Sequence, residues 1–170
     1  MKSKLLLLVA GVMLLAGVSI AVLQAYVFMA IAWFWDVRPP TVGYFLLLPA
    51  LIASGLMLGA LGLMLSSMIR QLENFAGVMN FVIFPMFFAS SALYPLWRIN
   101  DASPLLFWIC TFNPFTYAVE LIRFALYGQF NLVAMLVVIG CTCLFLAAAV
   151  IGYDPLRGFM SRKDGGPAKS

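Results

Sequence analysis

The sequence predicts an all-α fold: a polytopic membrane helix bundle with four spanning helices and a short extracellular re-entrant helix pair. Four runs contain no charged side chain, at residues 5–35, 42–69, 75–96 and 132–153, and each reaches the roughly 20 apolar residues that cross a bilayer. Only 9% of residues are charged, 65% are hydrophobic and the mean hydropathy is +1.07, whereas about a quarter of a soluble domain is charged. Because backbone groups in hydrocarbon must pair within their own segment, these runs are expected to be helices.

The first run ends in the aromatic sequence Trp-Phe-Trp at residues 33–35. Tryptophan favours the headgroup level of a membrane, and Pro39 and Pro40 then stop the helix. Lys2 and Lys4 precede the run, as basic residues do in a signal peptide. Its apolar stretch is much longer than the roughly 7–15 residues of a signal-peptide core, so we expect a retained spanning helix.

The second run contains small residues at helical spacing. Gly55, Gly59 and Gly62 would let another helix approach its backbone closely, so we interpret them as a packing face. In a four-helix chain without further helices, we expect this face to be left uncovered.

A polar turn joins the second and third runs at residues 66–74. Arg70 and Glu73 are three residues apart and could pair on a short helix. The turn is either simply solvated or a contact surface for a cytoplasmic partner, with Arg70, Gln71 and Glu73 as the contact candidates.

The third run contains Pro85, and an interior proline removes one helical hydrogen bond and kinks the helix. The kink is either a fixed shape or a hinge. The residues beyond it predict a polar, bent outer end: Ser90, Ser91, Tyr94 and Pro95.

Residues 99–129 are largely apolar, which a solvated loop would not be. Ser103-Pro104 and Asn113-Pro114 are helix start signals, and Gly128 is a plausible C-terminal stop. We therefore expect two short re-entrant or interfacial helices at the outer surface.

The second of these short helices carries a polar stripe at helical spacing, made by Thr116, Glu120, Arg123 and Tyr127. Glu120 and Arg123 lie one turn apart and can neutralise each other. The alternative is a fifth spanning helix over residues 113–127, which would bury both charges and reverse the side of the tail.

Lysine and arginine in short loops set the orientation of a membrane protein, with the excess on the cytoplasmic side. With the N-terminus inside, the inner basic residues are Lys2, Lys4, Arg70, Arg157, Arg162, Lys163 and Lys169, and the outer ones are Arg38, Arg98 and Arg123. We therefore predict a multi-pass protein of the cell (inner) membrane, with both termini cytoplasmic and a polar tail at residues 154–170.

Several classes of function are disfavoured. The chain has no histidine and three cysteines, and neither a metal site nor a disulfide framework is expected. Scattered acidic residues disfavour an enzyme, and the four runs hold no carboxylate to relay protons. The net charge of +4 is spread over helix ends, so no nucleic-acid partner is expected. Without a G-x-x-x-x-G-K-[ST] phosphate loop the chain cannot bind ATP by that route, so no cofactor is expected on it.

Three segments resemble the type 2 ATP-binding-cassette (ABC) transporter permeases. RQLENF at residues 70–75 and NFVIFPMFFASSALYPL at residues 80–96 resemble the fifth-helix region of that family. NPFTYAVELIRFALYG at residues 113–128 resembles the segment before its last helix. Daunorubicin-resistance-type and nodulation-factor-export-type permeases look most similar. The resemblance makes residues 1–153 the C-terminal part of a six-helix permease domain.

The resemblance implies the permease subunit of an ATP-driven exporter in which a separate ABC ATPase subunit hydrolyses ATP. Further partners would be membrane lipid and a second permease copy, in a homo- or heterodimer, or the missing N-terminal half. The implied ATPase contacts are Arg70, Gln71 and Glu73. The implied outer gate contains Pro85, Ser90, Ser91, Tyr94 and Pro95, and the implied extracellular re-entrant helix contains Asn113, Pro114, Glu120 and Arg123.

Apolar, aromatic spans point to a hydrophobic drug-, lipid- or glycan-like substrate. The alternative function is a truncated or non-transporting membrane assembly protein. The sequence does not decide the substrate, the direction of transport, the identity of the ATPase, or whether the chain is a fragment or a functional short form.

Overall fold

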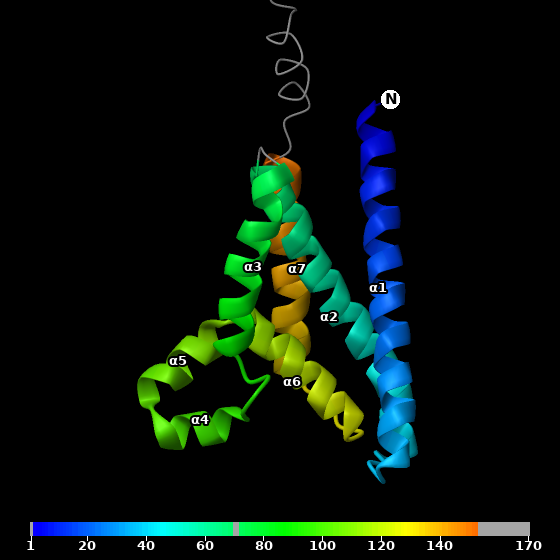
Figure 1. Cartoon of the computed structure of the whole chain (residues 1–170), viewed down its shortest axis with the longest axis vertical. Coiled ribbons are helices and arrows are strands. Elements are labelled where there is room, and N and C mark those ends of the chain that lie inside the picture. Colours follow the sequence, from blue (N-terminus) through cyan, green and yellow to red (C-terminus); the bar gives the residue numbers. More distant parts are fainter. Residues whose placement is uncertain (1, 70–71, 153–170) are drawn as a thin grey trace, which may run out of the picture.

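The computed structural model describes the backbone of residues 2–69 and 72–152, and the side chains of residues 8–69 and 77–152. Within these ranges the chain is all-helical, without strands, which confirms the predicted fold class (Figure 1). The elements are α1 (Lys2–Phe34), α2 (Thr41–Met68), α3 (Leu72–Phe88), α4 (Leu96–Ala102), α5 (Pro104–Phe112), α6 (Pro114–Leu126) and α7 (Leu132–Gly152).

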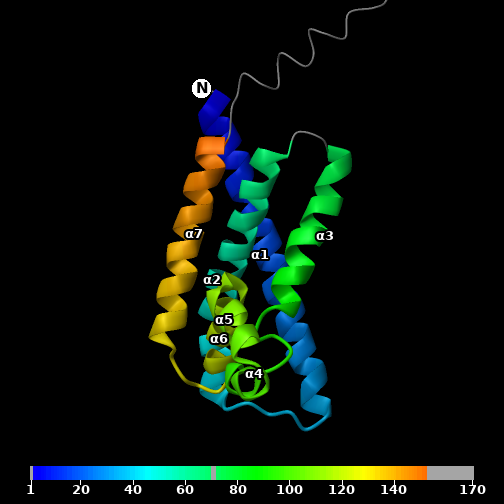
Figure 2. The same ribbon diagram turned by 90° about the vertical axis from the view of Figure 1, so that its left-hand side faces the viewer.

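The long helices run alternately up and down the molecule. The start of α1 and the end of α7 lie at one end. Helix α4, the start of α5 and the end of α6 lie toward the other, which is the outer end in the predicted orientation (Figures 1 and 2). Helices α1, α2 and α7 are long and apolar enough to cross a membrane, as expected of the first, second and fourth runs. The chain is therefore a multi-pass membrane protein.

Helix α3 is shorter than its run predicts. The run was expected to remain helical to Leu96, but α3 ends at Phe88, so that boundary is wrong. Its 17 residues span about 25 Å, somewhat less than the roughly 30 Å hydrocarbon core. The residues that follow turn away and lead into α4, a helix that the sequence did not predict.

Helix α2 lies at the centre of the bundle and contacts α1, α6 and α7. The buried core joins α2, α6 and α7, and half of its members are alanine: Ala50, Met57, Ala60, Leu61, Ala118, Leu121, Ala125, Ala134, Val138 and Phe145. Small residues let membrane helices pack with their backbones close together. This core fixes α6 against the two spanning helices beside it.

The small-residue face of α2 is covered within the chain. A methyl group added at Gly55 would lie 3.2 Å from Val18 Cγ2, and one added at Gly59 would lie 3.2 Å from Leu14 Cγ. The expectation that this face would be uncovered is therefore wrong at Gly55 and Gly59, because α1 supplies the covering side chains. Gly62 faces α3 instead.

Some predicted contacts fall outside the described part of the chain. The ATPase-contact candidates Arg70 and Gln71 and the tail at residues 154–170 lie there, as does the side chain of Glu73.

Candidate functional site

The candidate site is the re-entrant hairpin formed by α5 and α6, together with the outer end of α3. The axes of α5 and α6 meet at 85°, so the chain enters the bundle from its outer end and returns to that end (Figure 1). The helices begin at Pro104 and Pro114, as predicted. Gly128 follows α6 with a φ of +74°, a conformation that glycine adopts without strain. The 85° bend and the return of the chain to the end from which it came agree with the predicted re-entrant path (Figure 1).

The two predicted helix caps differ in the structure. The side chain of Ser103 makes no capping hydrogen bond to α5, contrary to the expectation from the Ser-Pro pair. Asn113 does cap α6, because its Oδ1 accepts a hydrogen bond from the Phe115 N–H at 3.0 Å. Its Nδ2 donates to two carbonyl oxygens near the end of α3, Met86 O at 2.6 Å and Ala89 O at 2.7 Å.

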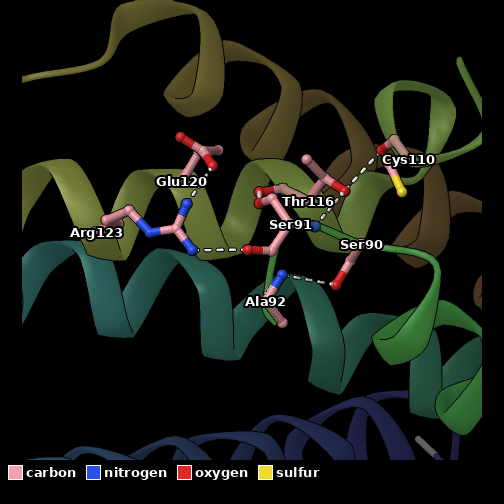
Figure 3. A network of polar contacts seen from close by, with 7 residues as sticks. All are labelled: Ser90, Ser91, Ala92, Cys110, Thr116, Glu120 and Arg123. Carbon is pink, nitrogen blue, oxygen red and sulfur yellow. Dashed lines mark hydrogen bonds and ion pairs between the residues drawn. The ribbon is translucent and has the colours of Figure 1, made fainter. Parts of the chain in front are cut away.

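Ser91 and Thr116 join the segment after α3 to the hairpin, and both are fully buried, with an exposed fraction of 0%. The Ser91 N–H donates to Thr116 Oγ1 at 3.3 Å, and the Ser91 hydroxyl donates to Thr116 O at 3.5 Å (Figure 3). Thr116 Oγ1 itself donates to Cys110 O at 2.6 Å. Thr116 therefore connects α5, α6 and the segment after α3.

Glu120 and Arg123 form the ion pair expected from their spacing, with 2.8 Å between Arg123 Nη1 and Glu120 Oε1. Their side chains are only 13% and 29% exposed. Arg123 Nη2 also donates to the Ser91 carbonyl at 2.7 Å (Figure 3). The pair thus orients a guanidinium that holds the segment after α3.

The outer-gate candidates divide into two groups. Ser90 and Ser91 are buried beside the hairpin, and the Ser90 hydroxyl donates to Phe87 O at 2.6 Å. Tyr94 is exposed, and Pro95 directly precedes α4. The structure therefore bonds Ser91 to the hairpin and buries Ser90 directly before it in the chain, whereas Tyr94 is left exposed.

An open apolar cavity lies between α3 and the apex of the hairpin, with α2 and α7 behind it. Its volume is about 690 Å³, and its lining residues are Leu61, Pro85, Met86, Ala89, Trp108, Ile109, Phe112, Asn113, Pro114 and Phe145. Pro85, another outer-gate candidate, forms part of this wall. The amide of Asn113 already bonds α3 and α6, so the cavity surface offers mainly hydrocarbon and aromatic contacts.

The sequence did not indicate the backbone carbonyls of Met86, Ala89 and Ser91 as members of the site. An Asn-Pro pair signals a helix start, which accounts for the Oδ1 of Asn113. The partners of its Nδ2 lie 24 and 27 residues away, and no local pattern marks them.

Three helices that are long and apolar enough to cross a membrane, with the bent pair of α5 and α6 packed among them, define a polytopic membrane protein. The family model described as ABC-2 type transporter matches residues 6–127, more than half of the chain. The chain belongs to the ABC-2 type transporter family and is a transmembrane component of such a transporter rather than its catalytic ATPase. Neither the search of curated proteins nor the search of solved structures found a match.

Proposed function

We propose that this chain is the permease subunit of an ATP-driven exporter of hydrophobic drug-, lipid- or glycan-lipid-like substrates. Members of the family normally work as dimers with an ABC ATPase subunit, and the sequence has no phosphate-loop motif of its own. A separate ATPase would hydrolyse ATP, and its closure would tilt the helices between inward- and outward-facing states. The location would be the cell (inner) membrane, with both termini cytoplasmic.

The cavity between α3 and the hairpin is the observation that supports a hydrophobic substrate. Its volume of about 690 Å³ falls in the roughly 300–1,000 Å³ range of small-molecule sites. Trp108 and Phe112 supply aromatic surface there, and no charged side chain lines it. Such a surface favours burial of apolar groups over binding of ions.

Export of a hydrophobic fluorescent dye from cells tests the proposed function. We expect efflux when the chain is expressed with its ATPase and any second permease polypeptide, and loss of efflux after ATP depletion. Efflux by the chain alone that survives ATP depletion would instead establish an autonomous secondary transporter. Stable association with the ATPase without export of any hydrophobic substrate would favour the non-transporting assembly protein.

A pair of tryptophan variants tests whether the cavity binds the substrate. Trp108 lines the cavity, whereas Trp97 lies on α4 outside it, and the two are 57% and 66% exposed. Losing a large apolar contact removes about 1.5–3 kcal/mol, so Trp108→Ala should raise the KM for dye export about tenfold or more. Trp97→Ala should leave the KM unchanged. Equal effects of the two changes would exclude the cavity as the binding site.

The inner turn is the proposed contact with the ATPase. Exchanging its charges, with Arg70→Glu combined with Glu73→Arg, should reduce the amount of ATPase that co-purifies in mild detergent. Unchanged co-purification would remove Arg70 and Glu73 from the proposed contact.

A further inference from the structure

We propose that Asn113 is a joint that fixes the outer end of α3 to the re-entrant hairpin, so that the two move as one unit. For transport, this inference rests on the proposed function and makes Asn113 a positioning residue. One carboxamide serves two helix termini: Oδ1 caps the start of α6, and Nδ2 binds two carbonyls at the end of α3.

The end of α3 has a clear need for such a donor. The last carbonyls of a helix have no N–H partner in their own helix, and a buried carbonyl that water cannot reach is destabilising unless another group donates to it. Pro85 O accepts from the Ala89 N–H, Met86 O from Asn113, and Phe87 O from the Ser90 hydroxyl. Asn113 thus supplies from the hairpin the bond to Met86 O, and it also donates to Ala89 O directly after the helix.

A second attachment lies a few residues further along the chain. Arg123 donates to Ser91 O at 2.7 Å, while Ser91 and Thr116 are bonded to each other through backbone and side-chain groups. The rings of Phe87 and Phe115 also meet edge to face, with centroids 5.9 Å apart. The residues on both sides of the helix end are therefore held by α6.

Rigid attachment at this place has a consequence for the cavity. Met86 and Ala89 form one part of its wall, and Trp108, Phe112 and Asn113 form another. If Asn113 holds these parts at a fixed separation, the end of α3 cannot tilt away from the hairpin. Because the buried core fixes α6 against α2 and α7, the wall of the cavity that α3 supplies is then held in place through α6.

The substitution Asn113→Asp separates the two halves of the joint. Aspartate is a good N-cap, so it retains the bond to the Phe115 N–H, but an ionised carboxylate has no donor for the Met86 and Ala89 carbonyls. Asn131 offers a matched control. Its Oδ1 caps α7 by accepting from the Ala134 N–H at 3.0 Å, so Asn131→Asp repeats the same chemical change at a helix start that lies away from α3.

The measurement is the distance distribution between spin labels at Phe88→Cys on α3 and Tyr127→Cys after α6, in the full chain in proteoliposomes. Both positions are exposed, at 64% and 66%, and the background carries alanine at Cys110, Cys141 and Cys143. We expect a narrow distribution in the parent and in Asn131→Asp. We expect one about twice as wide in Asn113→Asp, because the end of α3 loses its attachment.

An unchanged distribution in Asn113→Asp would overturn the joint, and so would equal broadening in both variants, because that would indicate general loosening. If Asn113→Asp does not accumulate, Asn113→Ser replaces it, since serine keeps a cap acceptor but loses the pair of donors. In a parent that exports dye, Asn113→Asp should lower kcat severalfold, and because Asn113 also lines the cavity, the added charge should raise the KM for a hydrophobic dye as well. If the parent exports nothing, the proposed function fails. The spin-label distances would still decide whether Asn113 attaches the end of α3 to the hairpin.

Discussion

Because Gly43 has no side chain, α2 can approach the end of α6 closely. A Cβ atom at this position would overlap the Leu126 carbonyl oxygen and would lie 2.9 Å from the Leu126 carbonyl carbon. Because backbone cannot move aside as a flexible side chain can, Gly43→Ala should destabilise the bundle by about 1–3 kcal/mol. The check is the midpoint of thermal unfolding in detergent, which should fall.

Gly140 on α7 provides the control for Gly43. Nothing lies within 4 Å of a methyl group added there, and alanine favours helix more than glycine does. Gly140→Ala should therefore leave the unfolding midpoint unchanged or raise it slightly. An equal fall for both variants would show that the close approach of Gly43 to Leu126 has no special cost.

The ion pair between Glu120 and Arg123 should be coupled energetically. Each single alanine change leaves a partly buried charge without its partner, at a cost of about 1–3 kcal/mol. The double change leaves neither charge, so its loss of stability should be smaller than the sum of the two single losses. Unfolding midpoints of the four proteins complete the cycle, and strict additivity would contradict an energetic role for the pair.

The structure adds an asymmetry to this cycle. Arg123 also donates to the Ser91 carbonyl. In the described part of the chain, the polar partner of the Glu120 carboxylate is Arg123. Arg123→Ala should therefore destabilise the bundle more than Glu120→Ala does. The sequence predicted the pair, but it could not predict this third group, because Ser91 lies 32 residues before Arg123.

At the scale of the elements, Gly55 and Gly59 allow α1 to pack close to α2. Gly59 lies against Leu14, with only 3.2 Å from an added methyl group to Leu14 Cγ. Gly59→Leu should push α1 away from α2, because the larger side chain occupies the space of Leu14. Spin labels at Met13→Cys and Ile52→Cys, both at exposed positions, should show a longer or broader distance distribution.

Gly17 on α1 is the matched control for Gly59, since nothing lies within 4 Å of a methyl group added to it. Gly17→Leu should leave the distance distribution unchanged. A separation of α1 from α2 in both variants would indicate an effect of side-chain size in general, and not of the Gly59 contact.

The helix starts were easier to predict than the helix ends. The Ser-Pro and Asn-Pro pairs correctly predicted where α5 and α6 begin, because proline fits the first helical position regardless of tertiary contacts. The end of α3 was placed too late because hydropathy continues through Leu96, while the helix stops at Phe88. Its carbonyls are bonded by Asn113 from the hairpin, and such a long-range partner is invisible in a local pattern. Helix α4 was missed for a different reason, because its seven residues mix polar and apolar side chains and form no apolar run.

At the scale of the whole molecule, the bundle has two chemically different ends. The hairpin, α4 and the loop between α1 and α2 lie toward one end, and the first residues of α1 and the last of α7 lie at the other (Figure 2). The sequence has an excess of basic residues near its two termini and in the turn after α2, and this pattern predicts a cytoplasmic location for the second end. The length of the apolar runs could predict the spanning helices, because it depends on the membrane and not on particular contacts. The orientation from the charge pattern stays a prediction.

Cysteine labelling in intact cells tests this topology as a whole. Trp97 precedes the hairpin, Tyr127 follows it, and Ser66 lies near the other end of α2; all three are exposed. In a chain with its native cysteines replaced, a membrane-impermeant maleimide should label Trp97→Cys and Tyr127→Cys without lysis, and Ser66→Cys only after lysis. The two outer positions must agree because α5 and α6 return to the end from which they enter. If labelling places Trp97 and Tyr127 on opposite sides of the membrane, α5 and α6 form a broken span and not a re-entrant hairpin. If Ser66→Cys is labelled in intact cells while both outer positions are protected, the hairpin is retained but the orientation is reversed.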